Sequence, residues 1–452
     1  MKGWMKVSDI KKHPTVVRYY ESSAQSATLD NETVDYEWIR ELCLEAGADD
    51  VGVVSIERSE LDDQRDDILS VFPHAKTVIS FVARMNREPI RTPARSLANI
   101  EFHHTGDKIA ETAHHIVSAL EARGIRALNS AVGFPMEMDK FPGKTWVVSL
   151  KPVSVAAGLG HMGIHRNVIH PKFGNFILLG AVMIDARVNK EDRPIDYNPC
   201  LECKLCVSAC PVGAIGADGQ FNFSSCTTHN YREFMGGFSD WVETVVDSKN
   251  VKEYRNEVPL TETTSWWQSL SFGANYKAAY CLSVCPAGED VIGPFLKDRK
   301  GFMNDVLKPL QAKEETVYVT PGSDAEAFVK KRFPHKTVKR VGNGLRPNTI
   351  RGLINLMPHA FQPKQASGLN CTYHFAFTGD ETIQTTIDIR DNTILIRDGF
   401  HGKPDIRITV DSKTWLGIVA KEQNMAAALL TRKLRIKGNP KLLKNFEKCF
   451  PQ

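Results

Sequence analysis

The strongest chemical signal in the sequence is a group of seven cysteines between Cys200 and Cys285, out of ten in the whole chain. Cys200, Cys203 and Cys206 stand three residues apart, and Cys210 follows directly before a proline. Iron–sulfur proteins of the bacterial type use this spacing, in which three thiolates hold one cluster and the fourth reaches a second cluster. A structural zinc site takes four ligands in two pairs and leaves the third cysteine unexplained. We therefore predict a 4Fe-4S site.

A second set of thiols is incomplete. Cys281 and Cys285 stand four residues apart before a proline, but the position three before Cys281 is not a cysteine, and Cys226 lies far upstream. In a two-cluster arrangement Cys285 completes the first cluster, which leaves Cys210, Cys226 and Cys281 for the second. Either a non-cysteine group such as His229 or water fills the missing position, or the second cluster contains three irons.

Length and composition narrow the class of protein that carries these cysteines. The chain has 452 residues, of which 42% are hydrophobic, so it can form two or three domains with buried cores. Its net charge of +4 is too small and too evenly spread for a dedicated nucleic-acid or polybasic membrane protein. Clustered cysteines do not suit a disulfide scaffold, and we find neither an export signal nor an apolar run long enough to span a membrane. We expect a cytoplasmic protein.

The elements that must position the cysteines begin in the first half of the chain. Residues 1–35 are polar and without pattern, and we expect them to form an arm or cap. From Tyr36 a helical spacing of apolar residues stops at Gly47, and residues 109–120 form one face of a second helix. Buried strands are expected at 51–56, 76–82 and 176–184. Helices that alternate with strands predict an α/β or α+β domain over residues 36–195.

The remaining chain divides into three further parts. Residues 196–300 form the cluster module, whose long insertion holds three tryptophans that either pack as ordinary core or wall a substrate pocket. Residues 301–322 are expected to be a linker. Alternating apolar residues then predict a last part over 323–452, with a turn at Asp391–Asn392. Its strands are expected at 373–377, 385–389, 394–396 and 406–410, and a helix at 415–430.

A glycine motif precedes the cysteines. Gly158, Gly160 and Gly163 match the letters of the dinucleotide-binding fingerprint, and Asp185 follows about twenty residues later. A nucleotide-binding domain of that kind needs further strand–helix units after the motif, whereas here the cysteine segment begins at Cys200. The motif therefore does not predict nicotinamide or flavin binding.

Taken with its surroundings, the glycine segment resembles the corrinoid-binding core of reductive dehalogenases. The resemblance rests on Lys151–His165, on His-Pro-Lys-Phe-Gly at 170–174, on the paired cysteine motifs and on the reduced second motif. It covers about residues 40–300. Epoxyqueuosine reductases, a related family, share Pro-Lys-Phe-Gly but normally keep the full second motif.

The resemblance implies a nitroreductase-like domain that holds base-off cobalamin, packed on a two-cluster bacterial ferredoxin module. A glycine-rich loop suits such a site because backbone without a Cβ can lie close to the corrin ring. The implied corrinoid-binding residues are Gly158, Leu159, Gly160, His161, Met162, Gly163, Phe173 and Gly174.

The catalytic residues of that family transfer poorly to this chain. Phe176 stands where respiratory members carry an arginine, and their catalytic tyrosine falls near Gly106, beside His103 and His104. A side chain that titrates near neutrality could supply the proton that replaces a halogen on carbon. The candidates for this role are His103, His104 and, foremost, Lys151 in its apolar run.

The last part resembles sterol-carrier-protein-2 (SCP2) modules, through Met357–Phe361, Gly368–Leu369, Pro404–Val410 and Lys433–Gly438. This resemblance covers about residues 325–450. It implies an α/β sandwich with an apolar tunnel for a fatty or sterol-like ligand, although a structural cover or a dimerisation surface is an equal alternative.

Together these resemblances imply a corrinoid-dependent reductive dehalogenase that removes halide from an apolar organohalide. Electrons would come from a ferredoxin or flavodoxin and pass two iron–sulfur clusters to cobalamin, and the chain could form a homodimer. The alternative with the same cofactors is reduction of a non-halogenated, epoxide-like substrate, as in epoxyqueuosine reductase. A non-catalytic iron–sulfur electron-transfer or lipid-carrier protein is the third hypothesis.

Overall fold

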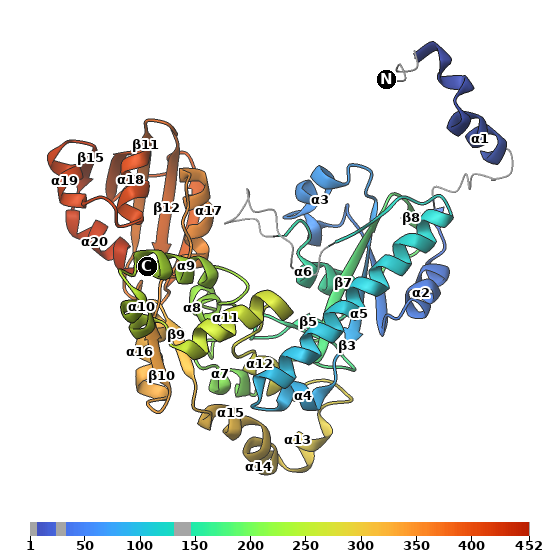
Figure 1. Ribbon diagram of the computed structural model, residues 1–452, viewed down its shortest axis with the longest axis horizontal. Helices are drawn as coiled ribbons and strands as arrows, with labels where there is room; N and C mark the ends of the chain where they lie inside the picture. The colour runs from blue at the N-terminus through green and yellow to red at the C-terminus, as the bar shows by residue number, and fades with distance from the viewer. Residues whose placement is uncertain (1–6, 24–32, 131–145, 452) are drawn as a thin grey trace.

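The computed structural model describes residues 7–23, 33–130 and 146–451. Figure 1 shows an N-terminal domain in blue to cyan, a middle region in green to gold and a C-terminal domain in orange to red. The middle region lies between the two domains, and helix α1 (Pro14–Ser23) stands apart from the N-terminal domain together with the helical turn Val7–Lys12. In the part of the chain that is described, no helix is long and apolar enough to cross a membrane.

The N-terminal domain is built on a four-stranded sheet in the order β2-β3-β7-β4, with every pair antiparallel. The three long strands are almost entirely buried and rich in Val and Ile, as expected for strands covered on both faces. The strands are β2 (Asp50–Ser55), β3 (Thr77–Arg84), β4 (Ala127–Asn129) and β7 (Ile177–Ile184). They confirm the three strands predicted from sequence. The antiparallel order excludes a parallel dinucleotide-binding sheet among the described strands.

Helices cover both faces of this sheet (Figure 1). α2 and α5 pack their apolar residues on one face, and α3 and α6 pack theirs on the other. α2 begins after Asp35, whose side chain accepts a hydrogen bond from the backbone N–H of Trp38, and it stops before Gly47, where φ is +115°. The helices are α2 (Tyr36–Glu45), α3 (Arg65–Val71), α4 (Arg87–Arg91), α5 (Arg95–Ala122) and α6 (Leu150–Ala156).

Short elements complete the domain. A helical turn covers Ser59–Leu61, β1 pairs in parallel with β8, and β5, which lies within the glycine motif, forms a small antiparallel pair with β6. These strands are β1 (Thr33–Val34), β5 (His161–Met162), β6 (Val168–Ile169) and β8 (Arg187–Val188).

The cysteine motifs lie on two short helices of the middle region. α7 (Leu205–Ala209) carries Cys206, and α12 (Tyr280–Ser283) carries Cys281. The insertion between them is helical, with α8 (Phe223–His229), α9 (Gly237–Asp247), α10 (Val251–Glu257) and α11 (Leu260–Phe272). Of its tryptophans, Trp266 is buried and stacks on Trp241 at 6.1 Å between ring centroids, whereas Trp267 is exposed.

Residues 301–322 are not a linker, contrary to the sequence prediction. Leu310, Val317 and Val319 are almost completely buried, in the same apolar cluster as Cys206. The glycine, lysines and proline that suggested a linker accompany apolar residues that face inward. The elements from here to residue 340 are α13 (Gly293–Lys297), α14 (Arg299–Phe302), the wide helical turn Met303–Leu307, α15 (Lys308–Ala312), β9 (Thr316–Val319), α16 (Asp324–Arg332) and β10 (Thr337–Arg340).

The C-terminal domain begins later than predicted. α16 and the strand pair β9–β10 pack with the cysteine motifs, so that residues 323–340 belong to the middle region. The domain itself is a five-stranded sheet in the order β13-β12-β11-β14-β15, in which only the central pair β11–β14 is parallel. Its elements are α17 (Ile350–Ala360), β11 (Cys371–Thr378), β12 (Gln384–Arg390), β13 (Thr393–Asp398), β14 (Ile406–Asp411), α18 (Ser412–Val419), α19 (Met425–Leu430), β15 (Leu434–Gly438) and α20 (Pro440–Lys448).

The predicted turn at Asp391–Asn392 is confirmed. Both residues are left-handed, with φ of 49° and 58°, as the tight turn of a β-hairpin requires. The single helix predicted for 415–430 is wrong, because α18 ends and the left-handed residue Lys421, with φ of 62°, separates it from α19.

Aromatic side chains fill the space between this sheet and its helices. The ring centroid of Phe375 lies 5.3 Å from those of Trp415 and Phe446, and Tyr373 lies 5.0 Å from Phe446. At this place side chains therefore occupy the interior in which the resemblance implies a tunnel.

Candidate functional site

The thiols predicted for the first cluster line one small cavity, although the last of them is far along the chain. They are Cys200, Cys203, Cys206 and Cys285. The loop that carries the first three is tightly curled, since Glu202 and Lys204 have left-handed φ of 49° and 61°. Residues other than glycine adopt this strained conformation where the surroundings impose it, often at ligand sites. The fold thus brings together the four ligands that the spacing predicted.

The four thiols that line this cavity match the ligand number of a 4Fe-4S cluster. A 4Fe-4S cluster binds each thiolate through a different iron, so its ligands stand farther apart than those of a single ion. Burial raises the pKa of Cys285 to about 12. Such a thiol binds as thiolate only when a positive centre replaces its proton, which the irons would do.

The thiols predicted for the second cluster adjoin the first set. Burial raises the pKa of Cys226 well above its ordinary value, and the neighbouring Cys210 and Cys281 raise it further. Cys281 also contributes to the raised pKa of Cys206, after burial. These three thiols therefore lie within one another's field, and Cys226 and Cys281 pack against the apolar cluster that contains Cys206 and Cys210. The arrangement fits two adjacent clusters and a short electron path.

Lys151, the foremost catalytic candidate, lies beside the second set of thiols. Its Nζ donates to the backbone oxygen of Arg166 at 2.7 Å and to Oδ1 of Asn167 at 3.0 Å. The Nδ2 of Asn167 is 3.9 Å from the Sγ of Cys281. Burial lowers the pKa of Lys151, while Cys281 and Cys226 raise it. Lys151 thus brings a positive charge to the side of the second set of thiols.

His229, predicted as one way to fill the missing position, lies on α8 three residues after Cys226. Its Nδ1 accepts a hydrogen bond from the backbone N–H of Tyr318 on β9, at 3.4 Å, and its buried Nε2 has no hydrogen-bond partner among the described residues. Burial lowers the pKa of His229 to about 3, and four surrounding lysines and arginines lower it further. Burial also raises the pKa of Tyr231, with Tyr276, Cys226 and Cys281 adding to the effect. His229 therefore stays a prediction for the missing ligand, and Asn167 and Tyr231 are further non-cysteine groups near this set of thiols.

The two candidate histidines do not join Lys151. His103 and His104 lie on α5, and Lys151 lies on α6, which packs on the opposite face of the sheet. The Nε2 of His103 is 3.4 Å from Oδ1 of Asn275 after the insertion helices, and His104 is exposed. The structure therefore divides the three predicted catalytic residues between two sites.

The glycines of the predicted corrinoid loop are required by contacts within the protein. A Cβ on Gly160 would overlap the backbone of Ile169, and one on Gly163 would stand 2.8 Å from the ring of His165. Gly158 and Gly174 have left-handed φ of 75° and 64°. We predicted that these glycines allow close approach to a corrin ring. The packing instead shows that Gly160 and Gly163 allow close approach to Ile169 and His165.

The predicted corrinoid residues differ in accessibility. Gly158, His161 and Met162 are partly exposed, so that these three can touch a bound group. The other predicted residues are buried within the protein, namely Leu159, Gly160, Gly163, Phe173 and Gly174. Phe173 also lines a cavity of about 480 Å³ next to Phe176. The described residues therefore offer a corrinoid a limited set of contacts.

One ion pair ties the Pro-Lys-Phe-Gly loop to the sheet. The Nε2 of His170 is 3.1 Å from Oδ2 of Asp50, and Nη2 of Arg40 is 3.2 Å from Oδ1. Burial raises the pKa of Asp50, but the hydrogen bonds from His170 and Val51 and the charges of His170 and Arg40 together lower it below its ordinary value. The ionised carboxylate therefore stabilises the folded state.

Replacement of Asp50 by asparagine is expected to lower the free energy of unfolding by about 1 kcal/mol at pH 7. Because the folded pKa is depressed, this contribution is complete above the ordinary carboxyl value of about 4 and is lost as the pH falls through the folded value. Urea unfolding of wild type and Asp50→Asn between pH 7 and pH 3 measures the difference. A gap that stays constant down to pH 3 would contradict the assignment.

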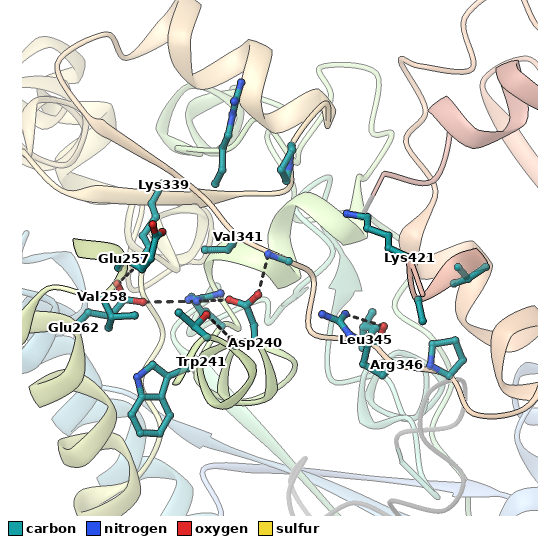
Figure 2. A pocket seen from close by; sticks show the side chains of 18 of the residues that line it. Asp240, Trp241, Glu257, Val258, Glu262, Lys339, Val341, Leu345, Arg346 and Lys421 are labelled. Carbon is teal, nitrogen blue, oxygen red and sulfur yellow. Dashed lines mark hydrogen bonds and ion pairs between the residues drawn. The ribbon is translucent and has the colours of Figure 1, made fainter. Parts of the chain in front are cut away.

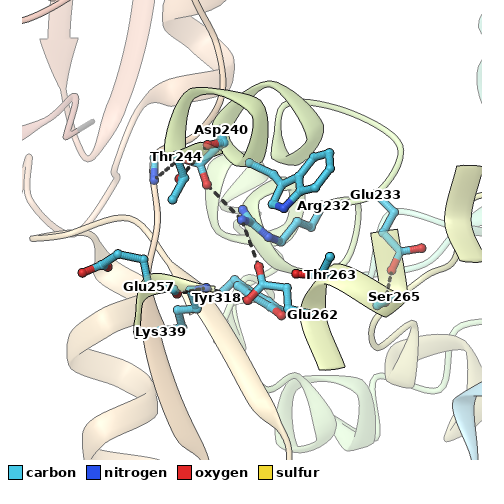
Figure 3. Close-up of polar contacts among 12 residues, drawn as sticks. Arg232, Glu233, Asp240, Thr244, Glu257, Glu262, Thr263, Ser265, Tyr318 and Lys339 are labelled. Atoms are coloured by element: carbon cyan, nitrogen blue, oxygen red, sulfur yellow. Dashed lines mark hydrogen bonds and ion pairs between the residues drawn. The ribbon is translucent and has the colours of Figure 1, made fainter. Parts of the chain in front are cut away.

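A third cavity, of about 360 Å³, lies between the insertion helices and α18 (Figure 2). Trp241 lines it, as the sequence hypothesis of a pocket wall allows. The Nη2 of Arg232 is 2.9 Å from Oδ2 of Asp240 and 3.7 Å from Oε1 of Glu262, and Lys339 binds Glu262 at 2.5 Å. Figure 3 shows this network converging on Arg232. These four charges pair with one another and so help to hold the wall of the cavity together.

Two known protein families match parts of the chain. Residues 193–216 match the 4Fe-4S binding domain, and residues 354–451 match the SCP-2 sterol transfer family. The first match confirms the predicted 4Fe-4S site. The second confirms the predicted SCP2-like domain and agrees with its later start.

Curated relatives are named epoxyqueuosine reductase. That of Staphylococcus aureus is 35% identical over 82 residues, which are 18% of this chain and 21% of the relative. That of Lactococcus garvieae is 26% identical over 200 residues, 43% of this chain and 54% of the relative. The chain spans between about a fifth and about a half of these relatives. Over these segments the chain is similar to epoxyqueuosine reductases.

Solved structures give weaker likenesses. Epoxyqueuosine reductase from Streptococcus thermophilus is 15% identical, covers 71% of this chain and 81% of its own, and has a TM-score of 0.34. A catabolic reductive dehalogenase is 18% identical, covers 40% of this chain and 25% of its own, and has a TM-score of 0.32. At these TM-scores the likeness decides nothing about function.

Proposed function

We propose that this protein is an iron–sulfur reductase that binds a corrinoid and reduces a non-halogenated, epoxide-like substrate. The observation that carries the proposal is the assembly of four thiols in one cavity with three more beside it, next to Lys151. Two adjacent clusters transfer electrons one at a time to a bound acceptor. The names of the curated relatives favour this alternative over dehalogenation, which the first resemblance implied.

A corrinoid, when bound, would supply a cobalt centre that exchanges electrons with the clusters. The residues available to hold it are Gly158, His161 and Met162, the accessible part of the glycine loop. Lys151 and Asn167 lie between this loop and Cys281 and would fix the geometry there. The SCP2-like domain supports a hydrophobic ligand, and a ferredoxin or flavodoxin remains the proposed electron donor.

Anaerobic purification with added iron, sulfide and cobalamin tests the proposal. We expect a corrinoid absorption spectrum with about one cobalt per chain and two clusters by iron and sulfide count. Turnover is then followed as oxidation of reduced flavodoxin with three probes: a small apolar epoxide, an epoxyqueuosine-modified tRNA stem loop and an apolar organohalide. Reduction of either epoxide supports the proposal. Halide release without epoxide reduction would establish dehalogenation instead, and clusters without cobalt would leave an electron-transfer protein.

Lys151→Ala is expected to lower kcat about a hundredfold while the iron content stays unchanged. A decrease of this size is typical when an enzyme loses a positioned proton donor. The lysine Nζ holds the Arg166–Asn167 turn next to Cys281, so the variant also loosens this turn. His104→Ala is the matched control, because His104 is exposed on the other face of the sheet. Equal rates for both variants would contradict a role for Lys151.

A further inference from the structure

Two arginines near the cysteines have buried donors without acceptors. The Nε and Nη2 atoms of Arg91 and of Arg95 are inaccessible to solvent and have no hydrogen-bond partner among the described residues. Arg95 is 7% exposed. A buried charged group without hydrogen bonds is strongly unfavourable, so such donors normally face an acceptor.

The remaining contacts of Arg95 leave one edge of its guanidinium open. Nη1 donates to the backbone oxygens of Ile90 at 3.1 Å and Thr92 at 3.2 Å. The guanidinium lies over the ring of Tyr280, with Cζ 5.3 Å from the centroid. Stacking engages the face of the planar group, but the N–H bonds of Nε and Nη2 point outward in its plane. These two donors therefore still need an acceptor in that plane.

Arg91, which precedes Arg95 by four residues, is held in the same way. Its Cζ lies 5.3 Å from the ring centroids of both Phe176 and Phe302. Two aromatic rings thus engage the guanidinium faces, and its edge donors Nε and Nη2 remain. Phe176 is the residue that stands where related respiratory enzymes carry an arginine.

The two arginines lie beside opposite ends of α12, the helix that leads from Cys281 toward Cys285. Tyr280, under Arg95, directly precedes Cys281. At the other end Ser283, two residues before Cys285, donates to the backbone oxygen of Ile90, the neighbour of Arg91, at 2.7 Å. Burial lowers the pKa of both arginines; Glu88 opposes this most for Arg91 and Tyr280 and Glu315 for Arg95, with smaller contributions from Cys285 and Cys281 respectively. Lys151 differs from both, because its Nζ is already engaged.

We propose that Arg91 donates hydrogen bonds to the sulfur atoms of the first cluster and Arg95 to those of the second, and that these two cations raise the reduction potentials of the clusters. The inference rests on the proposed function, since it requires two clusters. Each cluster with its thiolates carries net negative charge that grows on reduction, and a fixed positive charge beside it favours the reduced form. Hydrogen bonds to the sulfurs act in the same direction. Arg91 and Arg95 would thus act on electron transfer, through the clusters, rather than on binding of the substrate.

Redox titration of the reconstituted protein, followed by electron paramagnetic resonance, tests this assignment. We expect Arg91→Gln and Arg95→Gln each to lower one midpoint potential, and each a different one. The expected shift is about tenfold in the ratio of reduced to oxidised cluster at a fixed potential, or about 59 mV for one electron. Arg95→Lys keeps the charge, so it should change the ratio of reduced to oxidised second cluster by less than about threefold.

Arg87→Gln is the matched control, because Arg87 lies on the same helix as Arg91 but donates to the backbone oxygen of Asp290. The midpoint potentials of both clusters in Arg87→Gln should equal those in the wild type. Clusters that assemble normally with unmoved midpoints in both glutamine variants would overturn the inference and leave the proposed function intact, whereas a wild type without clusters would overturn the proposed function itself. Should Arg95→Gln fail to assemble, Arg91→Gln decides by the same criterion.

Discussion

Replacement of Cys285 by serine is expected to remove the first cluster, with loss of about four irons per chain and of all reductase activity. Cys285 lines the same cavity as Cys200, Cys203 and Cys206, so no other thiol of this set can replace it. The cluster site is surrounded by apolar residues, and its assembly contributes to folding of the middle region. Iron and sulfide counts, the visible spectrum and the thermal midpoint measure the loss.

Cys43→Ala provides the control for this experiment. Cys43 is fully buried on α2, in the core of the N-terminal domain, and it belongs to neither set of thiols. The variant should keep its iron while losing about 1 kcal/mol of stability through the smaller side chain. Full iron content in Cys285→Ser would refute the division of the cysteines between the two clusters.

Replacement of Gly174 by alanine is expected to lower the free energy of unfolding by about 3 kcal/mol and to reduce the iron content. Gly174 has a φ of 64°, and a Cβ there would overlap the backbone oxygen of Ala287. Ala287 follows Cys285 by two residues, so the strain falls on the contact between the N-terminal domain and the cluster module. Urea unfolding and iron analysis measure the two effects.

Gly106→Ala separates this effect from glycine replacement in general. Gly106 lies inside helix α5, where an added Cβ meets no atom within 4 Å. Alanine should therefore stabilise the helix by up to about 1 kcal/mol. A Gly174→Ala variant as stable as Gly106→Ala would show that the close approach to Ala287 does not constrain the fold.

Local patterns predicted most elements where one pattern dominates. The strands at 51–56, 76–82 and 176–184 are correct because runs of Val and Ile form buried strands, and the Asp391–Asn392 turn is correct because both residues tolerate left-handed backbone. The predicted linker at 301–322 is wrong because its glycine, lysines and proline accompany apolar residues such as Val306, Leu307 and Leu310, which pack in the cluster that contains Cys206. The predicted helix at 415–430 is wrong because apolar spacing continues across a break in the backbone.

The site was predictable in its ligands and not in its surroundings. Cluster ligands have a fixed spacing because one loop must present three thiolates to a single cluster, so the sequence by itself determined Cys200, Cys203, Cys206 and their partner Cys285. Asn167 and Tyr231 have no motif, because a group that only neighbours a cluster can come from any segment.

Only the tertiary structure decided which charged residues act together. It placed Lys151 beside Cys281 and His104 across the sheet, although the sequence offered both as candidates. It also left buried donors of Arg91 and Arg95 without acceptors near the helix that carries Cys281, because charge and burial act through space rather than along the chain. The cysteine spacing thus determined the metal chemistry, while the packing of α4, α6 and α12 determined the field around it.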